Sequence, residues 1–427
     1  ARMASAMYQK AGVVEFHDTD EMIKAAIAFS TQEPPNGRRI GMITNTGGPG
    51  SQAVDEAVDR GLELAVWSED GRAKLEESLY AEASLGNPVV VVATANADHF
   101  LAAVETLLAE EGTDMVLVFF VTAPFTDTEA IARRIKEAAD ASDKPLVVVV
   151  ETYSEFYGLI DKLRQSDLPV YEFAEDGARA LAAMARYAEL RDREVEAPPE
   201  LEVDRKAAEK IVSGHEGGDA YITQADAFAI LSAYGIPAPK VCAVSGPDDL
   251  DAAAAEIGYP CVLKIDSTDV IHKSDEGGVV LGIDSAEALE AAFADMTTRF
   301  SDAEFVLQEQ KPAGREIIIG ATESPGLGHL VMFGLGGVFV EVMRDVSFAL
   351  APLSRPEART LMRSIKGFPI LEGVRGEPGA DLEAVEELLL RVSRMVTDHP
   401  SITELDLNPI LAWPDGACAV DVRLKVR

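Results

Sequence analysis

Residues 260–279 read PCVLKIDSTDVIHKSDEGGV, which places an apolar strand, a lysine, a lone histidine and a pair of glycines in that order. Lys264 on the strand can reach a phosphate, and the backbone N–H groups around Gly277 and Gly278 can approach phosphate oxygens closely. His272 lies between them, and an imidazole with an ordinary pKa of about 6.5 is a competent nucleophile near neutral pH. This order suits the passage of a phosphoryl group from a nucleotide to an imidazole. A glycine-rich hairpin with an incidental surface histidine fits the same residues, so the rest of the chain has to distinguish the two.

Further features of the C-terminal half fit the same nucleotide site. Residues 305–310 (FVLQEQ) predict a strand whose polar end can offer donors and acceptors to a purine edge. Residues 314–320 (GREIIIG) begin another apolar strand with charges, and Arg315 together with Lys264 can neutralise phosphates. Residues 333–341 (FGLGGVFVE) predict a glycine-rich turn into a strand. A strand-end salt bridge at Lys264 and a simple bulge at the glycines are the structural alternatives, but the joint occurrence of these features in this order favours a nucleotide site.

The end of the chain offers ligands for a metal ion. Asn408 and Asp421 supply hard oxygens, and Mg²⁺ typically takes one or two protein ligands besides waters and phosphate oxygens. Along a strand Glu404, Asp406 and Asn408 would alternate onto one face. A hairpin turning at residues 414–416 would bring Asn408 and Asp421 together. A simple ion pair of Asp421 with the arginine two residues later is the structural alternative.

Composition excludes several classes of function. The formal charge is −35, from 38 basic and 73 acidic residues, so binding to nucleic acid or to anionic lipid is disfavoured. No apolar run approaches the roughly 20 residues needed to span a bilayer, so no membrane association is expected. The three cysteines, Cys242, Cys261 and Cys418, are far apart in the chain. They predict free thiols in a reducing, cytoplasmic compartment and argue against zinc.

The N-terminal half predicts a parallel sheet. Near-continuous runs of valine, isoleucine and leucine indicate strands that are buried on both faces and covered by helices. A flavodoxin-like open sheet is the most economical architecture for residues 36–192. The predicted strands lie at residues 39–44, 87–92, 115–121 and 145–150, with a last strand near 169–171.

The remaining residues complete the predicted organisation. A length of 427 residues predicts two to four domains at about 100–200 residues each. Residues 1–35 give a helix, a short strand and another helix, and do not make a domain alone. Residues 193–220 predict a linker, and residues 221–427 predict an α+β unit in which Thr223 caps a helix. The chain begins like the middle of a helix, so we expect it to be a fragment of something longer.

Residues 221–427 resemble an ATP-grasp domain of the type found in NDP-forming acyl-CoA synthetases, the relatives of succinyl-CoA synthetase. The matching segments are AYGIPAPK, EIGYPCVLKIDSTDVIHKSDEGGVVLGI, GREIIIGATESPGLGHLVMFGLGGVFVEVMRDVSFALAPLS and ELDLNPIL. The resemblance implies that His272 is the phosphohistidine of the nucleotide-binding half and that Asn408 and Asp421 hold Mg²⁺. The nucleotide contacts that it implies, together with those argued above, are Lys264, Gly277, Gly278, Val279, Gln308, Glu309, Gln310, Arg315 and Glu316.

The N-terminal half agrees with this resemblance. Residues 44–50 (TNTGGPG) are similar to the TNAGGPG segment of the family. The pattern itself predicts a strand, a turn and a helix N-terminus, where free N–H groups near Gly47 and Gly48 favour an anion. The resemblance implies that this helix points at a phosphohistidine. A tight turn that binds nothing is the alternative.

The family implies an activity for the whole enzyme, which is a cytoplasmic acid–thiol ligase. A small carboxylic acid, CoA and ATP give an acyl-CoA, ADP and phosphate through an acyl phosphate and a phosphohistidine relay. ATP or ADP and Mg²⁺ would bind this chain, whereas CoA would bind mainly to upstream domains in the same gene product or a separate subunit of an oligomer. Residues 1–35 would be the tail end of such a CoA-ligase-type domain. Two alternatives stay open, namely an ATP-grasp ligase that joins a carboxylate to an amine and a non-catalytic, nucleotide-sensing regulatory half.

Two further histidines, His329 and His399, lie in the C-terminal half of the chain. His329 fits the family pattern near the nucleotide, and we expect it to be structural. His399 precedes a proline at the end of a predicted helix, where we expect it to be solvated.

Overall fold

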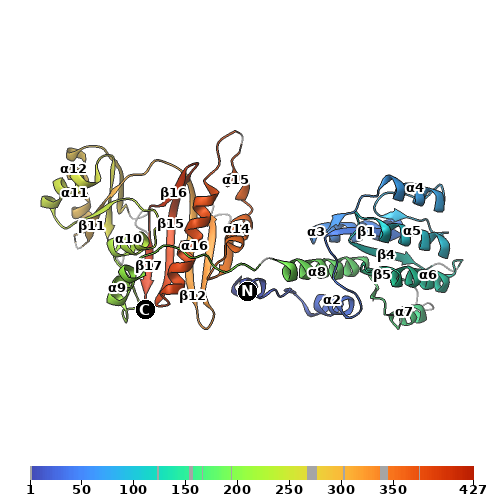
Figure 1. Ribbon diagram of the computed structural model, residues 1–427. Coiled ribbons are helices and arrows are strands. Elements are labelled where there is room, and N and C mark those ends of the chain that lie inside the picture. Colours follow the sequence, from blue (N-terminus) through green and yellow to red (C-terminus); the bar gives the residue numbers. More distant parts are fainter. Residues whose placement is uncertain are drawn as a thin grey trace. The chain divides into compact units, whose positions relative to one another are not determined.

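A computed structural model describes residues 2–122, 125–152, 157–165, 167–193, 195–266, 277–301, 303–336, 345–374 and 376–427 of the chain. The chain forms two compact units (Figure 1). The N-terminal unit is Ala11–Arg193, and the C-terminal unit combines Ala1–Lys10 with Glu194–Arg427. Within these described ranges no helix is both long and apolar enough to cross a membrane.

The N-terminal unit is built on a parallel sheet with the order β2-β1-β4-β5-β6, and β3 also pairs with β1. Without β3 this is the flavodoxin-like order, so the predicted parallel architecture is confirmed. The strands are β1 (Arg39–Thr44), β2 (Glu63–Leu64), β3 (Val89–Val90), β4 (Met115–Val121), β5 (Leu146–Glu151) and β6 (Val170–Tyr171). The helices are α2 (Thr19–Thr31), α3 (Gly47–Asp59), α4 (Glu69–Ser78), α5 (Ala97–Ala109), α6 (Thr128–Asp140), α7 (Tyr157–Arg164) and α8 (Ala174–Asp192).

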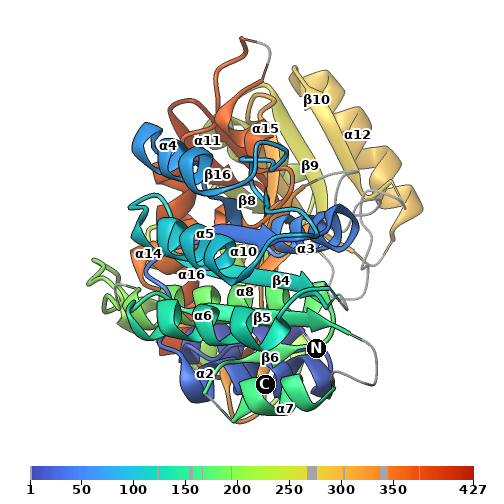
Figure 2. The same cartoon turned by 90° about the vertical axis from the view of Figure 1, so that its right-hand side faces the viewer.

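Helices cover both faces of this sheet, as the continuous apolar runs predict. Alternate residues of β4 enter two separate cores: Val116, Val118 and Phe120 face one, and the intervening residues face the other. Helices α5 and α6, which Figure 2 shows side by side, supply the first core, whereas α2, α3 and α8 supply the second. The prediction for residues 87–92 is wrong in extent, because β3 pairs with β1 only as far as Thr44 and Val92 then takes a positive φ of 67°.

The C-terminal unit contains two sheets. The first is antiparallel with the order β10-β9-β11-β8, and the second has the order β14-β13-β12-β15-β17-β7 with β16 also paired to β15. The predicted α+β character is confirmed. The strands are β7 (Ala220–Tyr221), β8 (Val241–Val244), β9 (Cys261–Asp266), β10 (Val279–Ile283), β11 (Glu304–Glu309), β12 (Arg315–Ser324), β13 (Gly328–Leu335), β14 (Val346–Leu350), β15 (Ile402–Trp413), β16 (Gly416–Ala419) and β17 (Arg423–Val426).

The helices of this unit cover one face of each sheet. They are α1 (Arg2–Ala11, in this unit as far as Lys10), α9 (Arg205–His215), α10 (Gln224–Ala233), α11 (Leu250–Ile257), α12 (Ala286–Arg299), α14 (Arg355–Arg363), α15 (Phe368–Glu372) and α16 (Leu382–Asp398). The side chain of Thr223 accepts a hydrogen bond from the backbone of Asp226, so the predicted cap of α10 is confirmed.

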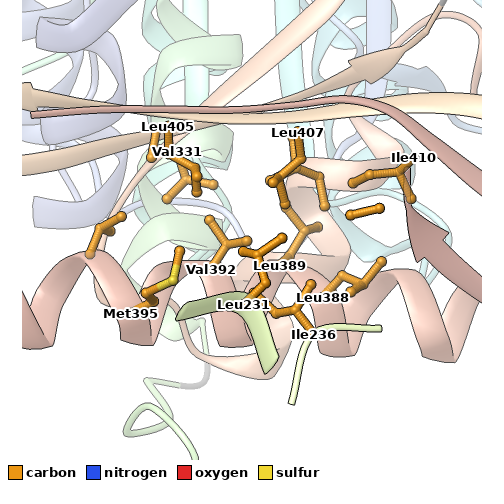
Figure 3. Close-up of a cluster of buried hydrophobic side chains, with 14 of the residues drawn as sticks. Leu231, Ile236, Val331, Leu388, Leu389, Val392, Met395, Leu405, Leu407 and Ile410 are labelled. Atoms are coloured by element: carbon orange, nitrogen blue, oxygen red, sulfur yellow. The ribbon is translucent and has the colours of Figure 1, made fainter. Parts of the chain in front are cut away.

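The largest core lies between α16 and the second sheet. Figure 3 shows Leu388, Val392 and Met395, which recur at helical spacing on α16, packed toward Leu405 and Leu407 of β15. Because strand residues alternate, the residues between and beside these leucines lie on the opposite face of the sheet. That face carries the polar residues Glu404, Asp406 and Asn408.

Two histidines are buried in this unit. The ring of His329 is 4% exposed and lies 2.6 Å from the carbonyl oxygen of Ile402, which fits the structural role expected for it. His399 is also 4% exposed and meets the ring of Tyr234 edge-on at 5.7 Å, so the expectation of a solvated side chain is wrong. Burial lowers the pKa of His399. The ring of Tyr234, which follows α10, covers this position, and no local pattern marks such a contact.

Candidate nucleotide-binding site

Lys264 and Gln308 share the face of the first sheet that turns away from its helices. Their neighbours Leu263, Ile265 and Leu307 belong to the core formed with α11 and α12. Lys264 lies opposite Val306, two residues before Gln308, so strand alternation puts both polar side chains on the other face. They are only 6% and 3% exposed. A buried lysine and a buried amide on one sheet face need partners from elsewhere in the chain.

These partners come from the segment after β16. Lys264 Nζ donates to the carbonyl oxygen of Val420 at 2.9 Å and lies 3.5 Å from Asp421 Oδ1. Gln308 Nε2 donates to the same carbonyl at 3.1 Å. Gln224 Nε2, at the start of α10, donates to Asp421 Oδ1 at 2.5 Å. We call Gln224, Lys264, Gln308, Val420 and Asp421 the Asp421 cluster; it ties the first sheet and α10 to the second sheet.

The hairpin of β15 and β16 places Asn408 beside this cluster. Ile410 pairs with Ala419, and Asp406 pairs with Arg423 across β15 and β17. Asn408 lies between these two pairs in the same register and therefore opposite Asp421. The predicted hairpin across residues 414–416 is confirmed. Asn408 is exposed, and together with Asp421 it offers the two oxygen ligands that suit Mg²⁺.

Some side-chain oxygens within the cluster and next to it have no hydrogen-bond partner among the described residues. These are Gln224 Oε1, Gln308 Oε1 and Asp406 Oδ1, and all three are buried. The two amides cannot be turned to relieve this, because each NH₂ group already faces an acceptor, the Asp421 carboxylate or the Val420 carbonyl. An unsatisfied buried acceptor costs about 1–3 kcal/mol. These acceptor oxygens therefore fit a bound group that brings hydrogen-bond donors or positive charge.

Asp406 is the most perturbed acid of this region. Burial raises its pKa to about 6; nearby Arg423 opposes that rise, and Asp421 and Glu404 add to it. A carboxyl with a raised folded pKa destabilises the folded state as the pH rises from the unfolded value of 3.8 through about 6. Such a carboxylate, kept at a cost in stability beside two other acids, is typical of a functional site.

Replacing Asp406 with asparagine is therefore expected to stabilise the C-terminal unit at neutral pH. The gain is at most about 3 kcal/mol above pH 7, and it shrinks as the pH falls toward 3.8, below which the wild-type carboxyl is mostly protonated in both states. Thermal unfolding of both proteins between pH 4.5 and 8 measures this difference. If the difference in stability between the two proteins is independent of pH, the pKa of Asp406 is not raised by burial.

The glycines that follow His272 end beside Lys264. Gly277 has a φ of +71°, which favours glycine, and the carbonyl of Gly278 accepts a hydrogen bond from Ile265 N at 3.0 Å. Val279 pairs with Lys264 across β10 and β9. Gly277, Gly278 and Val279 thus lie at the end of the strand that carries the lysine. His272 itself lies outside the described residues.

The remaining predicted contacts lie at the ends of β11 and β12. Glu309 bonds to Lys311 Nζ at 2.7 Å, and Gln310 Oε1 accepts from Gly282 N at 2.6 Å. Arg315 donates to the carbonyl of Pro378 at 2.7 Å rather than to the Asp421 cluster. The backbone carbonyl of Glu316 accepts a hydrogen bond from Gly336 N at 2.8 Å, and the side chain of Glu316 is exposed. Phosphate and nucleotide roles for these residues remain predictions.

Gly47 and Gly48 begin α3 in the N-terminal unit. Thr46 is the N-cap, but its side chain makes no capping hydrogen bond. Among the residues that the structure describes, and apart from the chain neighbours and the backbone of α3 itself, no atom lies within 4 Å of the position that a Cβ would take on either glycine, so the first turn of α3 is open there. Asn45 holds the preceding turn through two bonds of 2.9 Å to the backbone of Val121. An open N-terminus of this kind is suited to an anion.

Sequence reasoning missed Gln224 and the Val420 carbonyl. Gln224 directly follows the cap of a helix and is separated from Asp421 by 197 positions. No local spacing links the two residues. The backbone of Gln224 is also held, because its N–H donates to Asp266 at the end of β9 at 2.9 Å.

Comparisons with known proteins identify the domain to which these residues belong. The family model of the ATP-grasp domain matches residues 214–426. Acetate–CoA ligase [ADP-forming] I of Archaeoglobus fulgidus is 33% identical over 98% of this chain and 61% of its own length. The beta subunit of acetate–CoA ligase [ADP-forming] I of Pyrococcus furiosus is 38% identical over 52% of this chain and 99% of its own length.

A solved structure is also similar. Acetyl-coenzyme A synthetase 1 of Ca. Korarchaeum cryptofilum, in complex with coenzyme A, Ca-AMPCP and HgCl⁺, is 37% identical with a TM-score of 0.49. The match covers 52% of this chain and 100% of that chain. The chain spans only 61% of the length of the Archaeoglobus relative, although it matches that relative over nearly all of its own residues.

Proposed function

This chain belongs to the family of ADP-forming CoA ligases, and we propose that it carries the nucleotide-binding half of such an enzyme. The overall reaction would convert a small carboxylic acid, CoA and ATP into an acyl-CoA, ADP and phosphate, reversibly. The convergence of Lys264, Gln308 and Gln224 on Val420 and Asp421 supports this proposal most strongly. It joins a lysine suited to phosphate with a carboxylate suited to a metal ion.

In the proposed site each residue has a physical role. Lys264 is a buried ammonium whose charge would hold a nucleotide phosphate, and Gln308 to Gln310 would meet the base at the polar end of β11. Asn408 and Asp421 would hold Mg²⁺, which would neutralise phosphate charge when bound. Gln224 donates a hydrogen bond to Oδ1 of Asp421, and Lys264 lies near the same atom. We therefore assign the other oxygen, Oδ2, to the metal ion.

His272 would accept the phosphoryl group from the nucleotide. It lies between Lys264 and Gly277 in the chain, and both of these flank the site. In this step the imidazole nitrogen forms a bond to the γ-phosphorus while the bond to the ADP oxygen breaks. The same histidine would then pass the phosphoryl group toward the acyl site, which we assign to the rest of the enzyme.

Relatives fit two arrangements of that remainder. One relative matches this chain within a longer single protein, and another is named as a separate beta subunit. The proposed partners are therefore a CoA-binding domain and a second phosphohistidine segment, in the same polypeptide or in another subunit of an oligomer. Gly47 and Gly48 would place the open end of α3 toward a phosphorylated histidine.

Replacing Asp421 with asparagine tests the nucleotide site. We expect Mg²⁺-dependent affinity for ATP to fall by about tenfold to a hundredfold, because a metal ligand loses its charge and the partner of Lys264 is neutralised. Titration calorimetry with and without Mg²⁺ measures both affinities. Asp415→Asn, at an exposed position of the hairpin turn, is the matched control. Equal Mg²⁺ dependence in wild type and Asp421→Asn would overturn the metal assignment.

A further inference from the structure

Helix α1 packs on the C-terminal unit although the chain runs directly from it into the N-terminal unit. Its last turn carries Lys10, whose ammonium donates to the carbonyl oxygens of Leu350 at 2.9 Å and Pro352 at 2.6 Å. The same ammonium lies 3.2 Å from a carboxylate oxygen of Glu357. These partners are about 340 positions away in the sequence. A contact of this range is tertiary and joins two separate parts of the chain.

The surface that receives Lys10 presents oxygen atoms. Leu350 ends β14, which lies at one edge of the second sheet among the described strands, and Glu357 lies in the first turn of α14. An ammonium has three N–H donors, and here two backbone carbonyls and a carboxylate face it. The Lys10 and Glu357 side chains are 30% and 34% exposed, so the contact is partly shielded from water. Because two backbone carbonyls also accept hydrogen bonds from the ammonium, the position of the Lys10 side chain is fixed more closely than in an ordinary surface ion pair.

Helix α1 is packed against the rest of its unit. Ala6, 5% exposed, shows that one face of the helix is covered. Two residues beyond Lys10, Gly12 lies near Leu190 of the N-terminal unit. The passage from one unit to the other therefore takes place within a few residues of the lysine.

We propose that α1 is a docking segment and that Lys10 latches it to the carbonyl end of β14 and to Glu357. The occupant of this surface is the helix of this same chain that leads into the N-terminal unit. The functional consequence rests on the proposed function, in which a phosphoryl group passes between the nucleotide unit and the rest of the enzyme. Lys10 is then a positioning residue: it holds the connecting segment on the nucleotide unit and does not touch nucleotide.

Hydrogen exchange of the protein tests the latch. In Lys10→Met, which keeps the length of the side chain and its helix propensity, amides of residues 2–10 are expected to exchange at least about tenfold faster. Lys10→Arg retains donors and charge and should stay close to wild type. Lys136→Met, which removes an ion pair with Asp140 on the N-terminal unit, is the control and should leave α1 unchanged. Unchanged protection of α1 in Lys10→Met, or equal loss in both Lys10 variants, would overturn the latch.

A second measurement separates positioning from simple destabilisation. In the intact enzyme, Lys10→Met should keep the Kd for Mg²⁺–ATP within about twofold of wild type while phosphoryl turnover falls, and Lys10→Arg should restore the turnover. A parallel loss of nucleotide affinity and turnover would make Lys10 a structural residue and would overturn the positioning role. If the wild-type protein binds no nucleotide, the proposed function fails, and the exchange experiment still decides whether the latch exists.

Discussion

Replacing His272 with alanine should reduce phosphoryl transfer from ATP to the protein by at least about a thousandfold, which is typical of the loss of a covalent nucleophile. The methyl group of alanine cannot form the bond to phosphorus, while the contacts of Lys264 to Val420 and Asp421 do not involve the imidazole. Labelling with [γ-³²P]ATP measures the transfer, and calorimetry of the same sample measures nucleotide affinity.

The control for this substitution is His17→Ala, which removes an exposed histidine of the N-terminal unit. We expect full labelling in His17→Ala and unchanged nucleotide affinity in both variants. Full labelling of His272→Ala would place the phosphoryl acceptor elsewhere in the chain. Loss of labelling together with loss of nucleotide binding would indicate a structural role for the residue instead.

Replacing Lys264 with methionine should weaken Mg²⁺–ATP binding by about a hundredfold or more, because truncation of a buried charge that meets an anion costs about 2–5 kcal/mol. The side chain is only 6% exposed, so water cannot replace its charge fully. The variant also removes the donor to Val420 and the cation beside Asp421, so the C-terminal unit should unfold at a lower temperature.

Calorimetry and thermal unfolding of Lys264→Met separate these two effects. Lys206→Met, at an exposed position of α9, is the control and should change neither quantity. Wild-type affinity in a destabilised Lys264→Met would mean that the lysine only joins the two sheets. In that case the phosphate contact would have to come from another cation, and Arg315 would be examined next.

Local patterns predicted much of the fold. The apolar run 115–121 became β4 with those bounds, because a strand buried on both faces needs no information from distant residues. The hairpin that sets Asn408 opposite Asp421 was also predictable, since a short turn fixes its register. The cap at Thr223 is a similar case, because the hydroxyl and its partner are three positions apart.

Contacts between distant segments could not be predicted in this way. Gln224 meets Asp421 across 197 positions, and Lys10 meets Pro352 across 342. Neither Gln224 nor Lys10 belongs to a periodic pattern or to a motif with a defined spacing. The prediction for His399 was wrong for the same reason, since the side chain meets Tyr234, which is distant in the sequence. The juxtaposition of Asn408 and Asp421 was predictable because the hairpin is local, whereas the contact of Gln224 with Asp421 was not.

Mapping of the phosphorylated residue tests most directly whether this chain is a nucleotide-dependent phosphoryl carrier. Wild-type protein is incubated with ATP and Mg²⁺, digested under alkaline conditions that preserve phosphohistidine, and analysed by tandem mass spectrometry. We predict a phosphoryl group on His272, absent when Mg²⁺ is removed and lost again when ADP is added. A phosphoryl group on a different residue, or none on a protein that binds Mg²⁺–ATP, would contradict the proposed role of His272.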